Sequence, residues 1–317
     1  MRLLVPPPQP PDFPNAQTVG HRRGQLWEQL DLPAASRDGF LINLGNTAPL
    51  RGGRQIIVIH DAGVFSTPEA YSWKFRLWYK TIQGMLVRNG TPVVTVSEFS
   101  RGEIIRHLRA SPSQVSVISE GADHMNQIAP DAKILAKHGL NQHGFVLVVG
   151  TLAAHKNLHA LGSLAQNLEA RGVPLVIAGG LGGGAFRGGA GGLPPSACFT
   201  GRITDEELKA LYQAAACYVF PSRYEGFGLP AVEAMASGCP VVAADIPALR
   251  ETCGDAAVYC DPLSPENISQ QVLRLLDDTA LQESHRAAGL RHTQDMTWRN
   301  VAQSLLDILS THVRSTM

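Results

Sequence analysis

One stretch in the last third of the chain constrains its fold more than any other. It reads P-S-R-Y-E-G-F-G-L-P-A-V-E-A-M-A and spans residues 221–236. An apolar run, 215–220, precedes it, and a second one, 239–244, follows it after Ser237 and Gly238. Short apolar runs between turn residues are typical of buried parallel strands, and Pro230 suits the first turn of a helix. The stretch therefore predicts a strand, a loop, a helix and a second strand.

The predicted loop carries the residues with chemical potential. Gly226 and Gly228 let the backbone approach a ligand closely, and the free N–H groups near Leu229 favour a phosphate. Glu225 in the loop and Glu233 in the helix bracket the turn. The positive end of a helix dipole would by itself account for both acids. Their place at the carboxyl end of a strand, where open α/β sheets bind ligands, favours a binding site instead.

The stretch resembles the family 4 retaining glycosyltransferases of GT-B fold, which transfer a sugar from a nucleoside diphosphate to an acceptor hydroxyl. The resemblance is carried by Glu225 and Glu233 with seven residues between them, and it extends over nearly the whole chain. It implies an α/β protein with two Rossmann-like, doubly wound domains that face a cleft. We expect an acceptor-side domain over 1–142, a nucleotide-sugar-binding domain over 143–296, and a C-terminal helix over 297–317 that packs back on the first domain.

Apolar runs elsewhere support this organisation. Candidate strands lie at 40–44, 55–59, 92–96 and 115–118 in the first half, and at 144–150, 175–180 and 198–203 in the second. The family usually opens with a strand and a glycine-rich loop, and neither is found in the proline-rich first 20 residues. We therefore expect an abbreviated N-terminal domain that lacks its first β-α unit. The glycine-rich tract 179–192 opens no helix, so we interpret it as a surface loop.

The resemblance also assigns site residues outside the central stretch. His60 matches the histidine of the family's H-D step near the transferred sugar, although a lone histidine is more often structural. Lys156 matches the lysine that neutralises the donor diphosphate. Thr151 stands where many members carry arginine, and His155 stands where others carry a second arginine. The backbone near Arg202 holds the nucleotide base in the family. Asn157 could instead cap the following helix.

The resulting site has two catalytic candidates and a larger donor-binding set. His60 and Glu225 are the catalytic candidates, with Glu225 on the sugar hydroxyls and Glu233 on the ribose. The donor-binding set is Thr151, Lys156, Arg202, Gly226, Phe227, Gly228, Leu229 and Glu233. No Asp-x-Asp doublet is present to hold a metal on a diphosphate. The resemblance implies transfer with retention, with no metal and no other cofactor.

Composition excludes several other classes of protein. The 27 basic and 27 acidic residues balance, so no overall field favours nucleic acid. The five cysteines form no C-x-x-C pair, which indicates buried thiols in a reducing compartment and not a disulfide frame or zinc site. No apolar run is long enough to span a membrane, and the N-terminus has no signal-peptide core. We therefore expect a cytoplasmic protein.

A predicted helix over 68–88 leaves two interpretations open. Its apolar stripe consists of Tyr71, Phe75, Trp78, Ile82 and Met85, while Lys74, Lys80 and Arg88 lie elsewhere on it. The helix could pack on the core with a solvated face, or it could present a basic, aromatic surface to an anionic membrane. We also expect capping boxes at Ser100 with Glu103 and at Thr204 with Glu207.

The substrate is indicated less directly than the reaction. The segments H-D-A-G-V-F and Y-E-G-F-G-L-P are most similar to family members that use GDP-mannose in surface polysaccharide or lipopolysaccharide assembly. The expected partners are thus a nucleotide-sugar donor and a saccharide or lipid-linked saccharide acceptor. Three alternatives stay open: a glycosyltransferase that uses a UDP-sugar, a sugar-nucleotide epimerase of the same architecture, and a non-catalytic nucleotide-binding subunit.

Overall fold

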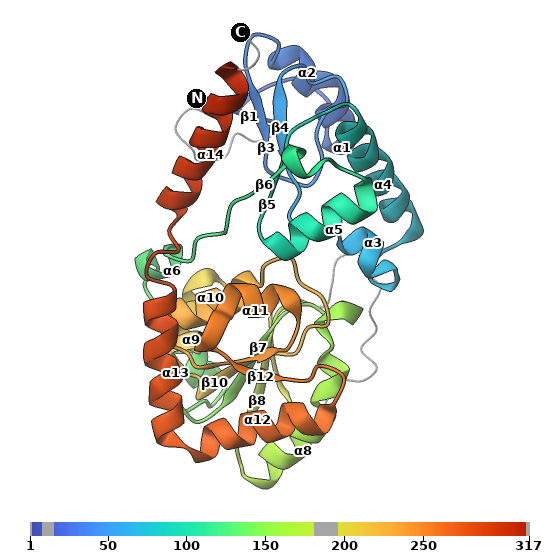
Figure 1. Ribbon diagram of the computed structural model, residues 1–317. Coiled ribbons are helices and arrows are strands. Elements are labelled where there is room, and N and C mark those ends of the chain that lie inside the picture. The colour runs from blue at the N-terminus through green and yellow to red at the C-terminus, as the bar shows by residue number, and fades with distance from the viewer. Residues whose placement is uncertain (1, 8–15, 181–195, 315–317) are drawn as a thin grey trace.

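The computed structural model of the protein describes residues 2–7, 16–180 and 196–314, and its two larger parallel sheets lie end to end (Figure 1). The glycine-rich tract interpreted as a surface loop lies almost entirely outside these residues. The strands of one sheet fall within 41–117 and those of the other within 146–260. The domain boundaries expected at 142 and 296 stay predictions.

The first sheet has the order β3-β4-β5-β6, with all neighbours parallel. Its strands are β3 (Leu41–Asn43), β4 (Gln55–Val58), β5 (Val93–Thr95) and β6 (Val115–Val117). The four apolar runs in this half therefore form strands as predicted. A separate parallel pair, β1 (Leu3–Val5) with β2 (Ala16–Thr18), lies beside this domain.

The second sheet has the order β12-β11-β10-β7-β8-β9. Its strands are β7 (Val146–Val149), β8 (Leu175–Ala178), β9 (Cys198–Gly201), β10 (Cys217–Phe220), β11 (Val241–Ala244) and β12 (Val258–Cys260). The chain runs from β7 outward through β8 to β9 and then returns to the other side of β7 for β10. The direction of winding reverses between β7 and β10, and such reversals leave a crevice at the carboxyl ends of the two strands.

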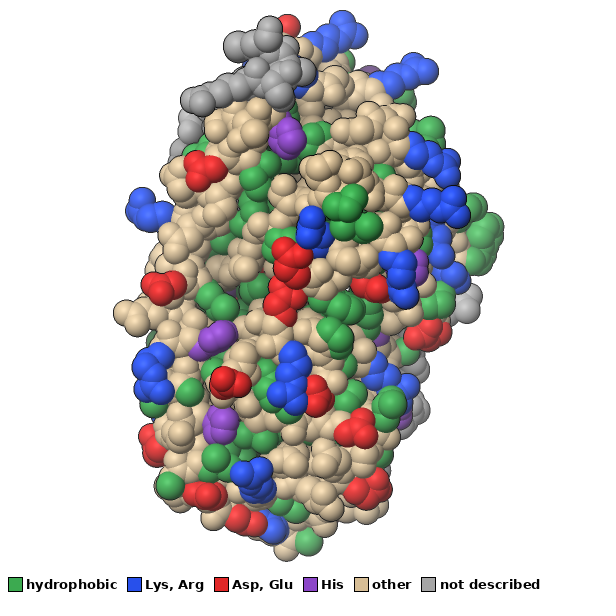
Figure 2. Space-filling model, in the orientation of Figure 1, with side chains coloured by type: hydrophobic (Ala, Val, Ile, Leu, Met, Phe, Trp, Pro, Cys, Tyr) green, Lys and Arg blue, Asp and Glu red, His purple; other side chains and the backbone are tan. Residues whose placement is uncertain are grey.

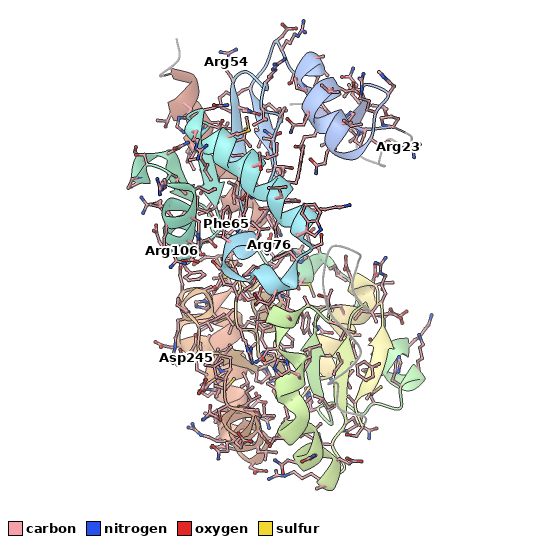
Figure 3. The ribbon with its side chains drawn as sticks, turned by 90° about the vertical axis from the view of Figure 1, so that its right-hand side faces the viewer. Arg23, Arg54, Phe65, Arg76, Arg106 and Asp245 are labelled. Carbon is pink, nitrogen blue, oxygen red and sulfur yellow. The ribbon has the colours of Figure 1, made fainter. Side chains whose placement is uncertain are left out.

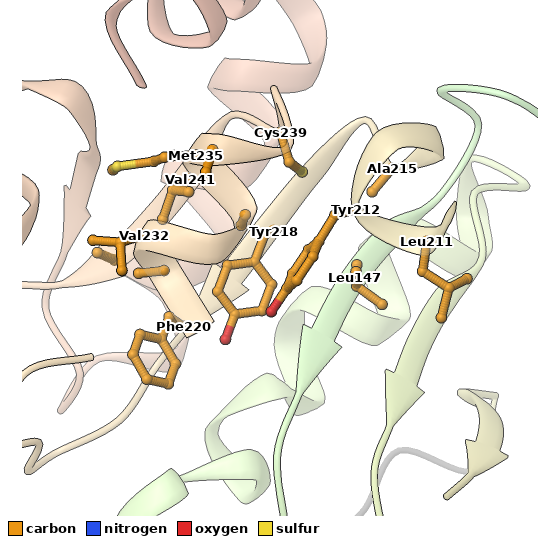
Figure 4. Close-up of a cluster of buried hydrophobic side chains, with 14 of the residues drawn as sticks. Leu147, Leu211, Tyr212, Ala215, Tyr218, Phe220, Val232, Met235, Cys239 and Val241 are labelled. Atoms are coloured by element: carbon orange, nitrogen blue, oxygen red, sulfur yellow. The ribbon is translucent and has the colours of Figure 1, made fainter. Parts of the chain in front are cut away.

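Helices cover both faces of the second sheet, which explains why its strands are continuous apolar runs. All four residues of β8, β10 and β11 are buried. Figure 4 shows part of the core on one face, where Tyr212 and Tyr218 pack edge to face at 5.6 Å between ring centroids. Phe145 and Leu147 are buried in the same cluster.

The helices alternate with these strands. They are α1 (Gly24–Leu26), α2 (Leu32–Ala35), α3 (Gly63–Ser66), α4 (Trp73–Arg88), α5 (Glu98–Leu108), α6 (His124–Gln127), α7 (Lys133–Lys137), α8 (Gly162–Ala170), α9 (Asp205–Ala214), α10 (Leu229–Ala236), α11 (Pro247–Cys253), α12 (Pro265–Asp277), α13 (Thr279–His292) and α14 (Trp298–Arg314). A π-helical segment, Trp27–Asp31, joins α1 to α2.

The last helix returns to the first domain. Val301, Leu305, Ile308 and Leu309 of α14 pack against a buried cluster of the first sheet that includes Ile56 and Val94. Figure 1 shows α14 in red beside the upper domain, above α13 on the lower one. At the crossing, the Asp123 carboxylate accepts a hydrogen bond from the Trp298 backbone N–H at 2.8 Å. A Cβ on Gly121 would lie 2.5 Å from the same nitrogen, so only glycine fits there.

Of three helix caps predicted from the sequence, one is confirmed and two are wrong. The cap of α5 is Ser97, whose hydroxyl accepts from the Ser100 N–H, so the predicted box at Ser100 is wrong by one turn. The capping box of Thr204 with Glu207 is confirmed. Asn157 is left-handed, with φ 59°, and its side chain caps no helix. Its amide instead donates to the carbonyls of Pro221 and Pro262 at 2.9 and 2.8 Å.

The outer face of α4 also differs from the predicted stripe. Ile82 is buried, but Met85 is 42% exposed, because the buried face continues through Leu86. Trp73 and Leu77, which the stripe did not include, are 61% and 59% exposed. No helix in the described part of the chain has the length and hydropathy needed to cross a membrane.

Candidate functional site

The centre of the candidate site is the crevice between β7 and β10. Lys156 follows β7, Glu225 follows β10, and the Lys156 Nζ lies 2.7 Å from the Glu225 Oε1. Only 19% and 12% of the two side chains are exposed, and the Lys156 ammonium also lies 5.3 Å from the Phe220 ring centroid. We call the space around Lys156, Glu225 and the start of α10 the donor crevice. In this crevice, at the carboxyl ends of two neighbouring strands, the charge of Lys156 is neutralised by Glu225.

The start of α10 faces this crevice without a protein cap. Gly228 is its N-cap residue, with φ 95°, and a Cβ there would lie 2.3 Å from a Leu249 methyl. The loop therefore requires glycine for conformation and for space. No side chain caps the helix, and its first turn, from Leu229, carries no acid. Phe227 is buried beneath the turn. An uncapped N-terminus beside a lysine can bind an anion such as a diphosphate.

Gly226 is held by the first domain. A Cβ at this residue would lie 2.6 Å from the His60 carbonyl oxygen, so the two domains touch with no room for a side chain. The Gly226 carbonyl accepts hydrogen bonds from the hydroxyls of Ser97 at 2.5 Å and Ser100 at 3.1 Å. The loop that carries Glu225 is thereby fixed from both sides of the cleft.

His60 and Asp61 follow β4 in the opposite domain, and Asp61 lies near enough to Glu225 and Lys156 to feel both charges. The His60 Nε2 lies 2.9 Å from the Leu44 carbonyl oxygen, and its Nδ1 lies 3.3 Å from the Glu120 carboxylate. The hydrogen bond to Glu120 is the main reason why the His60 pKa is raised. Burial raises the pKa of Asp61, and the charge of Glu225 adds to that effect. Asp61, the aspartate of the H-D step, therefore lies beside the Lys156–Glu225 pair.

Glu233 lies at the end of a chain of two hydrogen bonds that begins at Trp298 and passes through His124 of the other domain. The Trp298 Nε1–H donates to the His124 Nδ1 at 3.0 Å, so the His124 Nε2 carries the proton that faces the Glu233 carboxylate at 3.1 Å. Burial raises the pKa of Glu233, and His124 opposes that effect. Beneath it, burial also raises the pKa of Tyr212 and Tyr218 far above the usual value (Figure 4). No sequence pattern linked His124 to Glu233, since 109 positions separate them.

Aromatic rings complete the wall between the domains. The Tyr224 hydroxyl accepts from the Ala62 N–H at 3.1 Å, and its ring meets Phe99 edge-on at 5.7 Å. Tyr71 stacks on His155 with ring centroids 6.4 Å apart. Burial, followed by the charge of Lys156, lowers the pKa of His155, so the ring is neutral where other members carry arginine.

A carboxylate from the second domain caps a helix of the first. The Glu251 oxygens accept from the backbone N–H groups of Glu98 and Phe99 at 2.6 and 3.0 Å, at the start of α5. This contact stabilises the end of α5 that also carries Ser97 and Ser100. No sequence pattern indicated this contact, since Glu251 and Phe99 are 152 positions apart.

Two predicted donor-binding residues lie outside the contacts described above. Thr151 is half-buried after β7, and Arg202 is exposed after the edge strand β9. Within the described ranges, neither side chain forms a hydrogen bond or ion pair. The described residues also contain no group of three or more His, Cys, Asp or Glu side chains that could hold a metal. Metal independence stays a prediction.

The chain is similar to known proteins in family, sequence and fold. Residues 131–292 match the model of "Glycosyl transferases group 1". The chain is 32% identical over 317 residues to O-antigen chain mannosyltransferase B of Escherichia coli, covering 94% of this chain and 80% of that protein. It is 29% identical over 227 residues to O-antigen chain mannosyltransferase RfbU of Salmonella typhimurium, covering 66% and 57%.

Solved structures show the same architecture. HepE of Anabaena in complex with UDP and glucose superposes with a TM-score of 0.72 at 20% identity, covering 93% of this chain and 85% of that one. Sucrose-phosphate synthase from Thermosynechococcus elongatus gives 0.66 at 23% identity, covering 82% and 68%. These likenesses show the GT-B fold with two Rossmann-like domains. The family model and the 32% identical relative together show that the chain belongs to the group 1 glycosyltransferases.

Proposed function

We propose that this glycosyltransferase transfers mannose from GDP-mannose to a saccharide or lipid-linked saccharide acceptor in polysaccharide assembly. The observation that carries the proposal is the 32% identity to O-antigen chain mannosyltransferase B over 94% of the chain. Segments of about a third of the chain are also 34–35% identical to the serotype-specific mannosyltransferase WbdA of Escherichia coli. Family membership favours a glycosyltransferase over the epimerase and the non-catalytic subunit considered above.

The geometry of the donor crevice supports the proposed roles of its residues. In this proposal the diphosphate lies against Lys156 and the uncapped start of α10, and the ribose lies against Glu233. Arrival of the diphosphate supplies Lys156 with a second anion and so leaves Glu225 free to contact the sugar hydroxyls. The base contacts the backbone near Arg202, and Thr151 lines the path between them. His60 approaches the sugar from the facing domain.

The proposed reaction retains the configuration at the anomeric carbon and needs no metal. The acceptor oxygen forms a bond to the anomeric carbon while the bond from that carbon to the leaving phosphate oxygen breaks. The bonding electron pair leaves with the diphosphate, and the acceptor proton passes to that oxygen on the same face. Lys156 and the positive end of α10 stabilise the negative charge that develops there.

A donor panel tests the proposal. Purified protein is incubated with GDP-mannose, GDP-glucose, UDP-glucose and UDP-N-acetylglucosamine, each with saccharide and lipid-linked acceptors, and products are identified by mass spectrometry. Transfer from GDP-mannose at least ten times faster than from any UDP-sugar is expected. Faster transfer from a UDP-sugar would refute the donor assignment, and epimerised free donor without transfer would refute the reaction.

We further propose that the protein is cytoplasmic and that α4 rests on an anionic membrane surface. Support comes from the exposed face of the helix, where Trp73, Leu77 and Met85 lie beside Lys74 and Arg88. Apolar side chains flanked by cations are typical of interfacial helices. The thiols of all five cysteines are free, which agrees with a reducing compartment.

The membrane proposal has a matched test. The Trp73→Ser/Leu77→Ser variant is compared with Leu263→Ser, which removes a leucine that is 73% exposed on the second domain. Pelleting with phosphatidylglycerol vesicles is expected to weaken at least fivefold in the first variant only, and added salt is expected to release the wild type. Equal binding of both variants, or binding without dependence on lipid charge, would leave α4 as a core-packed helix.

A further inference from the structure

A hollow of about 720 Å³ lies on the outer face of the first domain, between α4 and the end of α5. We call it the α4–α5 hollow. The residues used below are Phe65 of α3, Lys80, Gly84 and Arg88 of α4, and His107 and Arg109 at the end of α5. Figure 3 turns this face toward the viewer and labels Phe65, and Figure 2 shows Lys and Arg side chains gathered along the edge where α4 lies.

The charge of the hollow is positive and is not neutralised by the protein. Lys80, Arg88 and Arg109 form no ion pair with any carboxylate of the described residues. Glu103, which pairs with His107 of the hollow at 3.5 Å, is also bound by the Ser66 hydroxyl at 2.6 Å and by Arg106 at 3.0 Å. Three cations in one depression without a counter-ion favour an external anion.

Aromatic contacts in the wall of the hollow position Lys80. The Phe65 ring stacks on His107 with centroids 5.2 Å apart, and the Lys80 ammonium lies 4.8 Å from the same ring. Burial lowers the pKa of Lys80, and the charge of Arg76 adds to that effect. A bound anion would offset both effects, because its negative charge favours the charged form of Lys80.

Two residues of the hollow go against the preference of their own helices. Gly84 lies inside α4, where glycine is less stable than alanine, yet a Cβ there would meet nothing within 4 Å and its φ does not require glycine. The missing side chain keeps the hollow open. Arg109 is the left-handed residue that ends α5, with φ 56°, a position that favours glycine. The other described non-glycine residues with positive φ are Asn46, His143 and Asn157.

Helix stability alone thus selects neither residue, and both serve the hollow. Positions that break local preference without a packing reason are expected at functional sites. Arginine at a helix C-terminus does interact with the dipole, but a glycine would remove the backbone strain. A function that requires the hollow to be open and cationic would explain why Gly84 and Arg109 are present although each is unfavourable for its helix.

We propose that the α4–α5 hollow is a phosphate-binding site separate from the donor crevice. The ligand chemistry is a phosphate or diphosphate group, which can be carried by a soluble phosphorylated molecule or by the headgroup of an anionic lipid. Arg88 and Arg109 supply planar donors for its oxygens, and Lys80 supplies a point charge. The site does not depend on the identity of the sugar donor.

Inorganic pyrophosphate is the first probe, measured by calorimetry on the full chain. The charge variant is Arg88→Gln/Arg109→Gly, and the filling variant is Gly84→Leu. The matched control, Arg274→Gln/Arg291→Gln, removes two exposed arginines of the second domain. Because the donor crevice can also take pyrophosphate, the variants are compared in a Lys156→Ala background, where binding is expected to weaken about tenfold or more in both hollow variants and less than about twofold in the control. A Lys156→Ala protein should keep this binding.

Melting temperatures show whether weaker binding in a variant comes from the loss of the site or from misfolding. Gly84→Ala should raise the melting temperature, and Arg109→Gly should not lower it, while each weakens pyrophosphate binding. Hollow variants that bind pyrophosphate like the control would overturn the proposal. Loss of all pyrophosphate binding in Lys156→Ala would also overturn it, since the only site would then be the donor crevice.

Vesicles distinguish the two sources of phosphate. If the ligand is a lipid headgroup, binding to phosphatidylglycerol vesicles falls at least fivefold in the charge variant relative to its control, and pyrophosphate competes with the vesicles. If vesicle binding is unchanged while pyrophosphate binding is lost, the site takes a soluble phosphorylated molecule. Either result supports the site, and neither depends on sugar transfer, so failure of the proposed function leaves the test intact.

Discussion

The donor crevice and the α4–α5 hollow both contain cationic side chains, but only the crevice also contains an acid that pairs with its cation. In the crevice, Lys156 pairs with Glu225 at 2.7 Å, and both side chains are largely buried. In the hollow, Arg88 and Arg109 are exposed and pair with no carboxylate among the described residues. A ligand in the crevice must compete with an internal acid, whereas a ligand in the hollow meets only water. The two proposals therefore differ: the crevice would select its ligand and support the reaction, whereas the hollow would only attract an anion.

The largest expected effect comes from Glu225→Gln, which breaks the pairing in the crevice and keeps its shape. Transfer should fall by roughly two powers of ten or more, because the carboxylate acts on the sugar mainly in the transition state. Binding of the bare nucleotide should hold or tighten, since Lys156 loses its competing anion. Single-turnover rates and calorimetry separate the two effects.

His60→Ala should give a similar loss of transfer from the facing domain. Full transfer by either variant would show that the donor sugar lies elsewhere. Arg274→Gln, which removes an exposed arginine of the second domain outside both proposed sites, serves as the control.

The next largest effect is a difference in stability between variants of the donor crevice and variants of the hollow. Lys156→Ala leaves the Glu225 carboxylate buried and unpaired, so the free energy of unfolding should fall by about 1–3 kcal/mol. Nucleotide affinity should fall about tenfold or more, as it should in Glu233→Ala. The matched removal of a cation in the hollow, Arg88→Gln, should change stability by less than about 0.5 kcal/mol. Denaturant titrations with nucleotide calorimetry measure both quantities. Equal stability losses in Lys156→Ala and Arg88→Gln would contradict the distinction between the two sites.

Sequence reasoning succeeded where the chemistry is local. The strand, loop and helix around Glu225 follow from apolar runs, Gly228 and Pro230, which act within a few residues of one another. The structure does place Lys156 beside Glu225, and the resemblance had indicated that both serve the donor. The capping box at Thr204 is likewise a contact within one turn.

Long-range contacts escaped prediction because no local pattern encodes them. The relay from Trp298 through His124 to Glu233 and the Glu251 cap on α5 join segments more than 100 residues apart. The exposure of Met85 depends on which side of α4 meets the sheet, and the periodicity of the sequence allowed a stripe rotated from the observed one. The α4–α5 hollow needs two helix ends to meet, so it was visible only in the folded chain.

The smallest expected effect concerns the edge of the crevice, where His60 faces Glu120. The hydrogen bond to Glu120 raises the His60 pKa, and the charge of Asp61 acts in the same direction, against burial. The folded protein therefore binds the His60 proton more tightly than the unfolded chain. This stabilisation is complete below the ordinary histidine pKa of about 6.5 and is lost as pH rises through the raised value. Melting temperatures of the wild type and Glu120→Gln should differ most below the ordinary histidine pKa of about 6.5 and converge as pH rises through the raised pKa. A difference that grows with pH would mean that His60 is held neutral, and His60 would then be a positioning residue without a proton to contribute.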